Sequence, residues 1–183
     1  RLKLKAVAIA TDPQTGIDLD ELSRALESWP IKAMWMMSNQ QNPVGCTLSR
    51  EKKQQLVALL AQHNVTLIED DVYSELYFGS EKPLPAKAFD RDDNVLHCSS
   101  FSKNLVAGFR VGWVAGGKHA QRIQRMQLMS TLSTSAPMQQ ALATYLGTRS
   151  YGRHLRRLRQ VLGQRKNLAL QSLKRHLPAG AKI

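Results

Sequence analysis

Short apolar runs alternate with amphipathic segments through the first two thirds of the chain. The apolar runs have the length and composition of β-strands at five places: residues 5–10, 32–37, 65–69, 95–99 and 109–115. Between them, apolar residues recur at helical spacing. Nearly continuous apolar strands separated by amphipathic helices are typical of an α/β fold whose mostly parallel sheet is covered on both faces. The pattern therefore predicts a three-layer αβα arrangement.

Two of the intervening segments carry helix start signals. Residues 18–28 begin with Asp18 at the N-cap and have Glu21 at the capping-box position. Residues 49–63 begin with Ser49 as the cap, and the inner face of this helix is expected to consist of Leu56, Leu59 and Leu60.

From about residue 118 onward the chain is predicted to be helical. One helix follows Gly117, another starts near Pro137, and a long one covers roughly 151–176, weakened only at Gly163. The final AKI follows a PAG turn and has the pattern of a strand being entered. Because the chain also starts without Met, we expect it to be a segment of a longer protein.

Composition narrows the class of protein. The chain has 183 residues and is 43% hydrophobic, which is enough for one domain with a real core and argues against disorder. No apolar run reaches the length of a membrane span, and no signal peptide is seen. The only cysteines, Cys46 and Cys98, do not form a metal-binding pattern. We expect reduced thiols, no metal and a cytoplasmic location.

Charge is distributed unevenly along the chain, whose formal net charge is +12. Residues 1–93 hold all 14 acidic residues and 11 of the Lys and Arg residues, whereas residues 94–183 hold the other 15 and no acid. A nucleic-acid surface is one interpretation. However, the basic residues do not alternate with aromatics, and several lie on the predicted long helix: Arg153, Arg156, Arg157 and Arg159. A solvated helix face, or contact with an acidic partner subunit, is favoured; some positive charge would also suit an anionic ligand.

Candidate chemistry falls at the ends of the predicted strands, where ligands bind in open α/β sheets. Asn42 opens the loop NPVG after one strand, Asp70 ends the next and is followed by Tyr73, and the loop SFSK, ending in Lys103, follows the third. Arg110 lies seven residues further on. Each motif alone is better explained by a turn, an acidic loop or a soluble lysine. The prediction depends on their occurring together, in this order, at strand ends.

This combination resembles the large domain of fold-type I pyridoxal-phosphate enzymes of the aminotransferase class I/II family. The matching pieces are NPVG, D-x-x-Y, S-x-S-K and the arginine seven residues on, with GIDLDEL upstream and FRVGW downstream. The resemblance covers nearly the whole chain. It implies that residues 1–148 are part of the cofactor-binding large domain. Residues 149–183 would then be a long connecting helix and the start of a small C-terminal domain.

The resemblance assigns roles around the cofactor ring. Lys103 would form the Schiff base with the aldehyde and move the α-proton in an active enzyme. Asp70 would keep the pyridine nitrogen protonated, whereas Asp71 would point elsewhere. Tyr73 and Asn42 would hydrogen-bond the ring's 3-oxygen.

The dianionic phosphate needs a forked cation and hydroxyl donors. By the resemblance these are Arg110, Ser100 and Ser102. A lysine that is partly desolvated and near another cation is a better nucleophile, and Arg110 could supply that charge to Lys103.

Other parts of such a site are expected outside this segment. The family's glycine- or serine-rich phosphate loop and ring-stacking aromatic lie upstream of residue 1, and its substrate-carboxylate arginine lies after residue 183. We therefore predict that the segment alone binds pyridoxal phosphate weakly or not at all.

Two functional classes fit these residues. One is a free-standing aminotransferase that moves an amino group between an amino acid and a 2-oxo acid. The other is the effector-sensing domain of a MocR-type regulator of the GntR group, which would contact DNA only through a winged helix-turn-helix domain outside this chain. The stretches MMSNQQNPVGCTLS, IEDDVYSELYF and FSKNLVAGFRVGWV resemble that regulator group and its neighbours, the aromatic and aminoadipate-type transaminases. The site residues fit both classes, and we favour the regulator domain, with residual transaminase capability. A homodimer is expected. A lapsed site is disfavoured because Lys103, Asp70, Tyr73 and Arg110 are all present.

Overall fold

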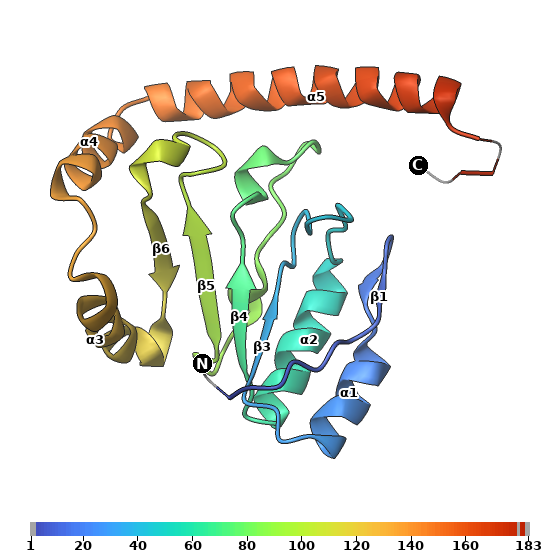
Figure 1. Cartoon of the computed structure of the whole chain (residues 1–183), viewed down its shortest axis with the longest axis vertical. Helices are drawn as coiled ribbons and strands as arrows, with labels where there is room; N and C mark the ends of the chain where they lie inside the picture. Colours follow the sequence, from blue (N-terminus) through green and yellow to red (C-terminus); the bar gives the residue numbers. More distant parts are fainter. Residues whose placement is uncertain (1–2, 179, 182–183) are drawn as a thin grey trace.

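A four-stranded sheet forms the centre of the computed structural model, which describes residues 3–178 and 180–181. Its strands lie in the order β3 (Ala33–Met36), β4 (Thr66–Asp70), β5 (Val95–Ser100) and β6 (Gly112–Ala115). The first three are parallel to one another, and the edge strand β6 is antiparallel to β5 (Figure 1). The predicted α/β class and mostly parallel sheet are confirmed.

Two capped helices, α1 (Leu19–Ser28) and α2 (Arg50–Gln62), precede and follow β3. The Asp18 side chain accepts from the backbone N–H groups of the first turn of α1, and the Ser49 hydroxyl accepts from the Lys52 N–H at 3.1 Å. Both predicted caps are confirmed.

The capping box of α1 differs from the expected form. The Glu21 carboxylate accepts from the Ala10 N–H at 3.0 Å. The Asp18 N–H that it would otherwise bind donates to the Ala10 carbonyl at 2.9 Å. Glu21 therefore fastens the incoming chain to the helix start.

The hydrophobic core lies between these helices and one face of the sheet. Because strand side chains alternate between faces, Leu67 and Val95 point into it and are 0% and 1% exposed. They pack against α1 and α2 through a cluster that includes Leu22, Leu26, Leu56, Val57 and Leu60. On the other face of the sheet, within the described residues, Trp35 remains 66% exposed and Val114 38% exposed.

The prediction of a strand at residues 5–10 is wrong. Residues 3–10 have no regular secondary structure, and the chain first pairs in a short hairpin of β1 (Thr11–Asp12) and β2 (Gly16–Ile17). A groove of about 730 Å³ separates residues 3–9 from β3. A β-strand requires backbone hydrogen bonds to a neighbouring strand, and residues 5–10 have no such neighbour within the described part of the chain.

The strand expected at 109–115 is shorter than predicted. Residues 107–109 form a 3₁₀ turn, η3 (Ala107–Phe109), and Arg110 has a left-handed backbone with φ of 52°. A residue in this conformation cannot continue a strand, so β6 begins only at Gly112. Arg110 thus lies in a turn beside the end of β5.

The remaining chain is helical, as predicted. A 3₁₀ turn, η4 (Gly117–His119), leads into three helices: α3 (Ala120–Thr131), α4 (Ala136–Leu146) and α5 (Ser150–His176). Gly163 does not interrupt α5, which runs across the edge of the sheet where the parallel strands end (Figure 1). None of the helices in the described part of the chain is both long and apolar enough to cross a membrane.

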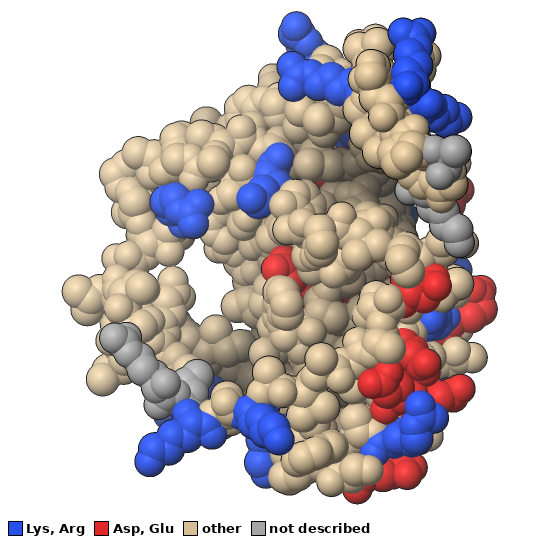
Figure 2. All heavy atoms as spheres, turned by 45° about the vertical axis from the view of Figure 1, so that its right-hand side comes forward, with Lys and Arg blue, Asp and Glu red and all other residues tan. Residues whose placement is uncertain are grey.

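Basic side chains are concentrated on α5, which contains no Asp or Glu. In the view of Figure 2, one group of Lys and Arg lies at the top, where α5 runs, whereas other Lys and Arg lie at the bottom, some of them beside Asp and Glu. The exposed basic residues of α5 include Arg153, Arg156, Arg157, Lys174 and Arg175. Arg159, counted with them from the sequence, instead packs over the Tyr77 ring at 4.4 Å from its centroid. The solvated or partner-facing interpretation of the other basic residues stays a prediction.

Candidate functional site

The carboxyl ends of three parallel strands bring the predicted site residues to one edge of the sheet. Asp70 is the last residue of β4, Ser100 is the last of β5, and Asn42 lies in the loop after β3. The registers Met36↔Glu69 and Asp70↔Cys98 place these ends side by side. The edge that the sequence predicted as a ligand site therefore exists in the fold.

Asp70 has a buried oxygen without a partner. Its Oδ1 atom is inaccessible to solvent and makes no hydrogen bond within the described residues. A carboxylate oxygen withdrawn from water without a donor costs free energy, and such groups are rare in folded proteins. This oxygen is suited to accept a hydrogen bond from a cationic N–H group of a ligand.

Lys103 and Tyr73 come from different loops and lie close together. The Lys103 Nζ is 5.8 Å from the centroid of the Tyr73 ring. Tyr73 is half-buried, whereas Lys103 is exposed, so the partial desolvation expected for this amine is not found within the described residues. The amine is open to reaction from solvent.

Ser100, Ser102 and Arg110 form a polar cluster beside this lysine. The Ser100 hydroxyl accepts from the Ser102 N–H at 3.3 Å, and the Arg110 Nη1 donates to the Ser102 hydroxyl at 3.4 Å. The left-handed turn at Arg110 directs the guanidinium back toward the Ser102 loop, where it also donates to the Ala107 carbonyl at 3.4 Å. Hydroxyl groups and a guanidinium in this arrangement suit an anion.

Asn42 is the predicted site residue that the structure connects least to the others. It is exposed, and its backbone N–H points to the Met37 sulfur at 3.5 Å. Its side chain makes no hydrogen bond within residues 3–178 and 180–181, and it lines the groove beside β3. Its contact with a ligand ring stays a prediction.

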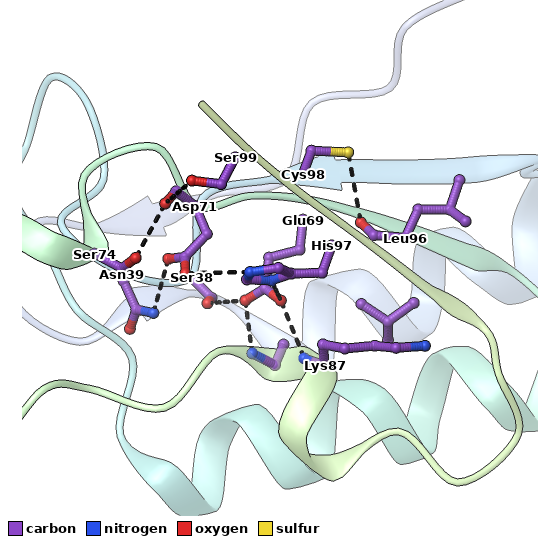
Figure 3. A network of polar contacts seen from close by, with 12 residues as sticks. Ser38, Asn39, Glu69, Asp71, Ser74, Lys87, Leu96, His97, Cys98 and Ser99 are labelled. Carbon is purple, nitrogen blue, oxygen red and sulfur yellow. Dashed lines mark hydrogen bonds and ion pairs between the residues drawn. The ribbon is translucent and has the colours of Figure 1, made fainter. Parts of the chain in front are cut away.

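A buried polar network surrounds Glu69, the neighbour of Asp70 in β4 (Figure 3). Because successive side chains of a strand point to opposite faces, the network lies on the other face of the sheet from the Asp70 side chain. At its centre Glu69, 0% exposed, accepts hydrogen bonds from four donors. These are the Ser38 hydroxyl, the Ala86 N–H at 2.6 Å, the Lys87 N–H at 3.0 Å and the His97 Nδ1 at 3.0 Å. Ala86 and Lys87 open the 3₁₀ turn η2 (Ala86–Phe89), so Glu69 fixes this turn to the end of β4.

Burial and hydrogen bonding act on Glu69 in opposite directions. Burial by itself raises the pKa of its carboxyl, but the hydrogen bonds from His97, Ser38 and the two backbone N–H groups outweigh it. The pKa of Glu69 is therefore lower than its ordinary value, and the residue is held as an anion.

Asp71 points into the same network, which confirms the expectation that it turns away from Asp70. Its carboxylate accepts from the Asn39 Nδ2 at 3.0 Å and lies 3.6 Å from the His97 Nε2. The Asn39 carbonyl in turn accepts from the buried Lys53 ammonium at 2.6 Å. Burial raises the pKa of Asp71 and lowers that of Lys53, because both charges are withdrawn from water.

The sequence motifs did not predict this network, although the alternation of side chains along a strand indicates part of it. In a strand, residues 69 and 71 must share a face and residue 70 the other, so one acid of the EDD run faces away from its two neighbours. His97 could not be paired with Glu69 from the sequence, because that contact depends on the register of β4 with β5.

The comparisons with other proteins agree with this geometry. Residues 1–182 match the family model described as aminotransferase class I and II. The chain is 68% identical over 183 residues to the uncharacterized HTH-type transcriptional regulator YdcR of Escherichia coli (strain K12), covering all of this chain and 39% of that protein.

Two solved structures have the same fold. Kynurenine aminotransferase of Pyrococcus horikoshii, solved in complex with PMP, superposes with a TM-score of 0.90 at 25% identity, over 96% of this chain and 45% of that one. The α-aminoadipate aminotransferase LysN of Thermus thermophilus, complexed with N-(5'-phosphopyridoxyl)-L-leucine, gives 0.86 at 25% identity, over 94% and 45%. The chain thus spans less than half the length of these proteins. The family match, the regulator relative and the shared fold together establish that this chain belongs to the aminotransferase class I and II family.

Proposed function

We propose that this chain is the pyridoxal-phosphate-binding part of the effector-sensing module of a DNA-binding transcription regulator of the MocR/GntR type. The observation that carries the proposal is the unpartnered buried oxygen of Asp70, at the sheet edge shared with Lys103 and the serine–arginine cluster. The high identity to an HTH-type regulator over the whole of this chain supports the regulatory setting. In this proposal DNA is bound by a separate domain, and the effector is an amino acid or a 2-oxo acid.

The chain has residues suited to the aldehyde, the ring and the phosphate of pyridoxal phosphate. When bound, pyridoxal phosphate supplies an aldehyde that condenses with primary amines and a ring that withdraws electrons. Lys103 supplies the amine, and the Asp70 oxygen accepts the hydrogen of the ring nitrogen. Tyr73 and Asn42 bind the ring oxygen.

The phosphate group is held by the cluster beside the lysine. Arg110 offers a forked cation, and Ser100 and Ser102 offer hydroxyl donors. We further propose that residues 1–148 belong to the large domain and residues 149–183 to the connecting helix and the start of a small domain.

A free-standing aminotransferase is the second candidate. It is favoured by the close superposition on two aminotransferases, with TM-scores of 0.90 and 0.86. The two candidates share the site and differ in what is attached to it. Specific DNA binding by the full-length protein, changed by an amino acid that reacts at Lys103, supports the regulator. Amino-group transfer without DNA binding supports the enzyme.

Borohydride reduction of the full-length protein loaded with pyridoxal phosphate is expected to label Lys103. Borohydride converts the C=N bond between the cofactor and its lysine into a stable secondary amine, which survives proteolysis and peptide mapping by mass spectrometry. The label should lie in the peptide that contains residues 99–110 and disappear in Lys103→Arg. Lys118→Arg, which changes a lysine outside the site, serves as the matched control and should keep the label. A label at any other lysine contradicts the proposal.

A further inference from the structure

Helix α5 contacts both loops that carry the reactive groups of the site. The Lys103 loop comprises residues 101–106, and the Tyr73 loop comprises residues 71–78. Within the described residues no hydrogen bond joins these two loops directly, although Lys103 lies beside the Tyr73 ring and Asp71 is hydrogen-bonded to Cys98 and Ser99 at the end of β5. Beyond these contacts, both loops bind to successive turns of α5, which runs across them at the strand ends (Figure 1).

The first fastening is at Asn104, the residue after the lysine, which is only 4% exposed. The His154 Nε2 lies 2.8 Å from its carbonyl oxygen, and because a carbonyl can only accept, this nitrogen carries the donated hydrogen. The Tyr151 hydroxyl donates to the Asn104 side-chain oxygen at 3.5 Å. The Asn104 side-chain nitrogen also donates to the Ser100 carbonyl at 3.5 Å, so the α5 contact reaches the end of β5.

The second fastening is at the Tyr73 loop, two residues beyond the tyrosine. The Arg159 Nη1 donates to the Glu75 carbonyl at 3.0 Å, and the same guanidinium stacks over the Tyr77 ring. About two turns further along the helix, the Lys166 ammonium lies 4.3 Å from the centroid of the Phe78 ring. Arg159 thus combines a charge-assisted hydrogen bond with a cation–π contact.

A continuous helix keeps these contacts at a fixed offset. His154 and Arg159 are five residues apart, which is about 7.5 Å along the helix axis. A displacement of α5 at one loop therefore moves the other. We propose that α5 sets the position of the Lys103 loop relative to the Tyr73 loop, with His154 and Arg159 as positioning residues. This inference rests on the proposed function and deepens it. A ligand that reacts at Lys103 and moves its loop would change the position of α5, and α5 would carry that change beyond the site.

Amide hydrogen exchange of the full-length, cofactor-free protein tests this coupling. Arg159→Ala removes contacts to the Tyr73 loop only, and His154→Ala removes a contact to the Lys103 loop only. If α5 couples the loops, each substitution accelerates exchange in both loops, by about fivefold for the loss of one such hydrogen bond. Arg156→Ala, which changes an exposed arginine of the same helix, is the matched control and should accelerate neither.

The decisive measurement is amide exchange in the loop that the substituted residue does not contact. Faster exchange confined to the loop that each residue touches overturns the proposal. Amide exchange in helix α2 reports on global folding in the same experiment. If Arg159→Ala accelerates exchange in α2, Arg159→Lys replaces it as the test variant. This substitution keeps the charge but loses the planar guanidinium, and it should still accelerate exchange in the Lys103 loop.

A second readout uses the protein loaded with pyridoxal phosphate. The neighbours of the lysine-linked cofactor, among them Tyr73, Asp70 and Arg110, influence its protonation, so Arg159→Ala should shift the pH midpoint of its near-ultraviolet or visible absorbance band. Arg156→Ala should leave that midpoint unchanged. Absence of any such band in the wild type contradicts the proposed function, whereas a wild-type band whose midpoint is unmoved by Arg159→Ala contradicts the coupling.

Discussion

Asp70→Asn is expected to weaken the binding of pyridoxal phosphate about 10- to 100-fold, since a hydrogen bond to a charged group contributes about 1.5–3 kcal/mol. The same substitution should leave the cofactor-free protein at least as stable as the wild type. The reason is that the Oδ1 atom of Asp70 is buried without a hydrogen-bond partner, so the substitution removes no hydrogen bond made by this atom in the cofactor-free protein. A loss of affinity without a loss of stability is the signature of a residue kept for its ligand.

The two quantities are measured on the full-length protein by cofactor titration and by urea unfolding without cofactor. Asp92→Asn is the matched control, because Asp92 is exposed and its side chain accepts no hydrogen bond in the described part of the chain. It should change neither value. Unaltered cofactor affinity in Asp70→Asn, or a clear destabilisation of its cofactor-free form, would show that Asp70 has a structural role instead.

The sequence predicted those elements whose signals are local. The Asp18 and Ser49 caps depend on residues within one helical turn, and both are found in the structure. The three C-terminal helices follow from their own periodicity. The convergence of Asp70 and Lys103 was predictable because parallel strands end at one edge of a sheet.

Features that depend on partners distant in the sequence could not be predicted. Residues 5–10 have the composition of a strand, yet a strand requires a paired neighbour, and none is present within the described residues. The contact of His97 with Glu69 depends on a strand register, and that of Arg159 with Glu75 depends on the path of α5 over the sheet. Neither follows from the local pattern. The left-handed backbone of Arg110 likewise results from the turn around it.

Glu69→Gln, one residue from Asp70, is expected to destabilise the protein by about 3 kcal/mol at pH 7. Glu69 accepts four hydrogen bonds in a site with no exposure to water. A glutamine offers one oxygen and turns an NH₂ group toward the remaining donors, which leaves the N–H groups of η2 or the His97 ring without an acceptor. Urea unfolding of the cofactor-free protein measures the difference, and Glu27→Gln, on the exposed side of α1, should have almost no effect.

The destabilisation caused by Glu69→Gln should shrink in acid. Because the pKa of Glu69 is lower in the folded protein than in the unfolded chain, its contribution to stability is present above the ordinary value of about 4.3 and is lost as the pH falls through the lower folded value. The raised pKa of Asp71 acts in the opposite sense, since its contribution is present at low pH and is lost as the pH rises through the folded value. Asp71 is present in both proteins, but the charge of Glu69 contributes to its raised pKa, so the gap between their unfolding free energies reports Glu69 together with its effect on Asp71. A gap that stays constant from pH 7 down to about 3 would mean that the charge of Glu69 does not hold η2 and His97 in place.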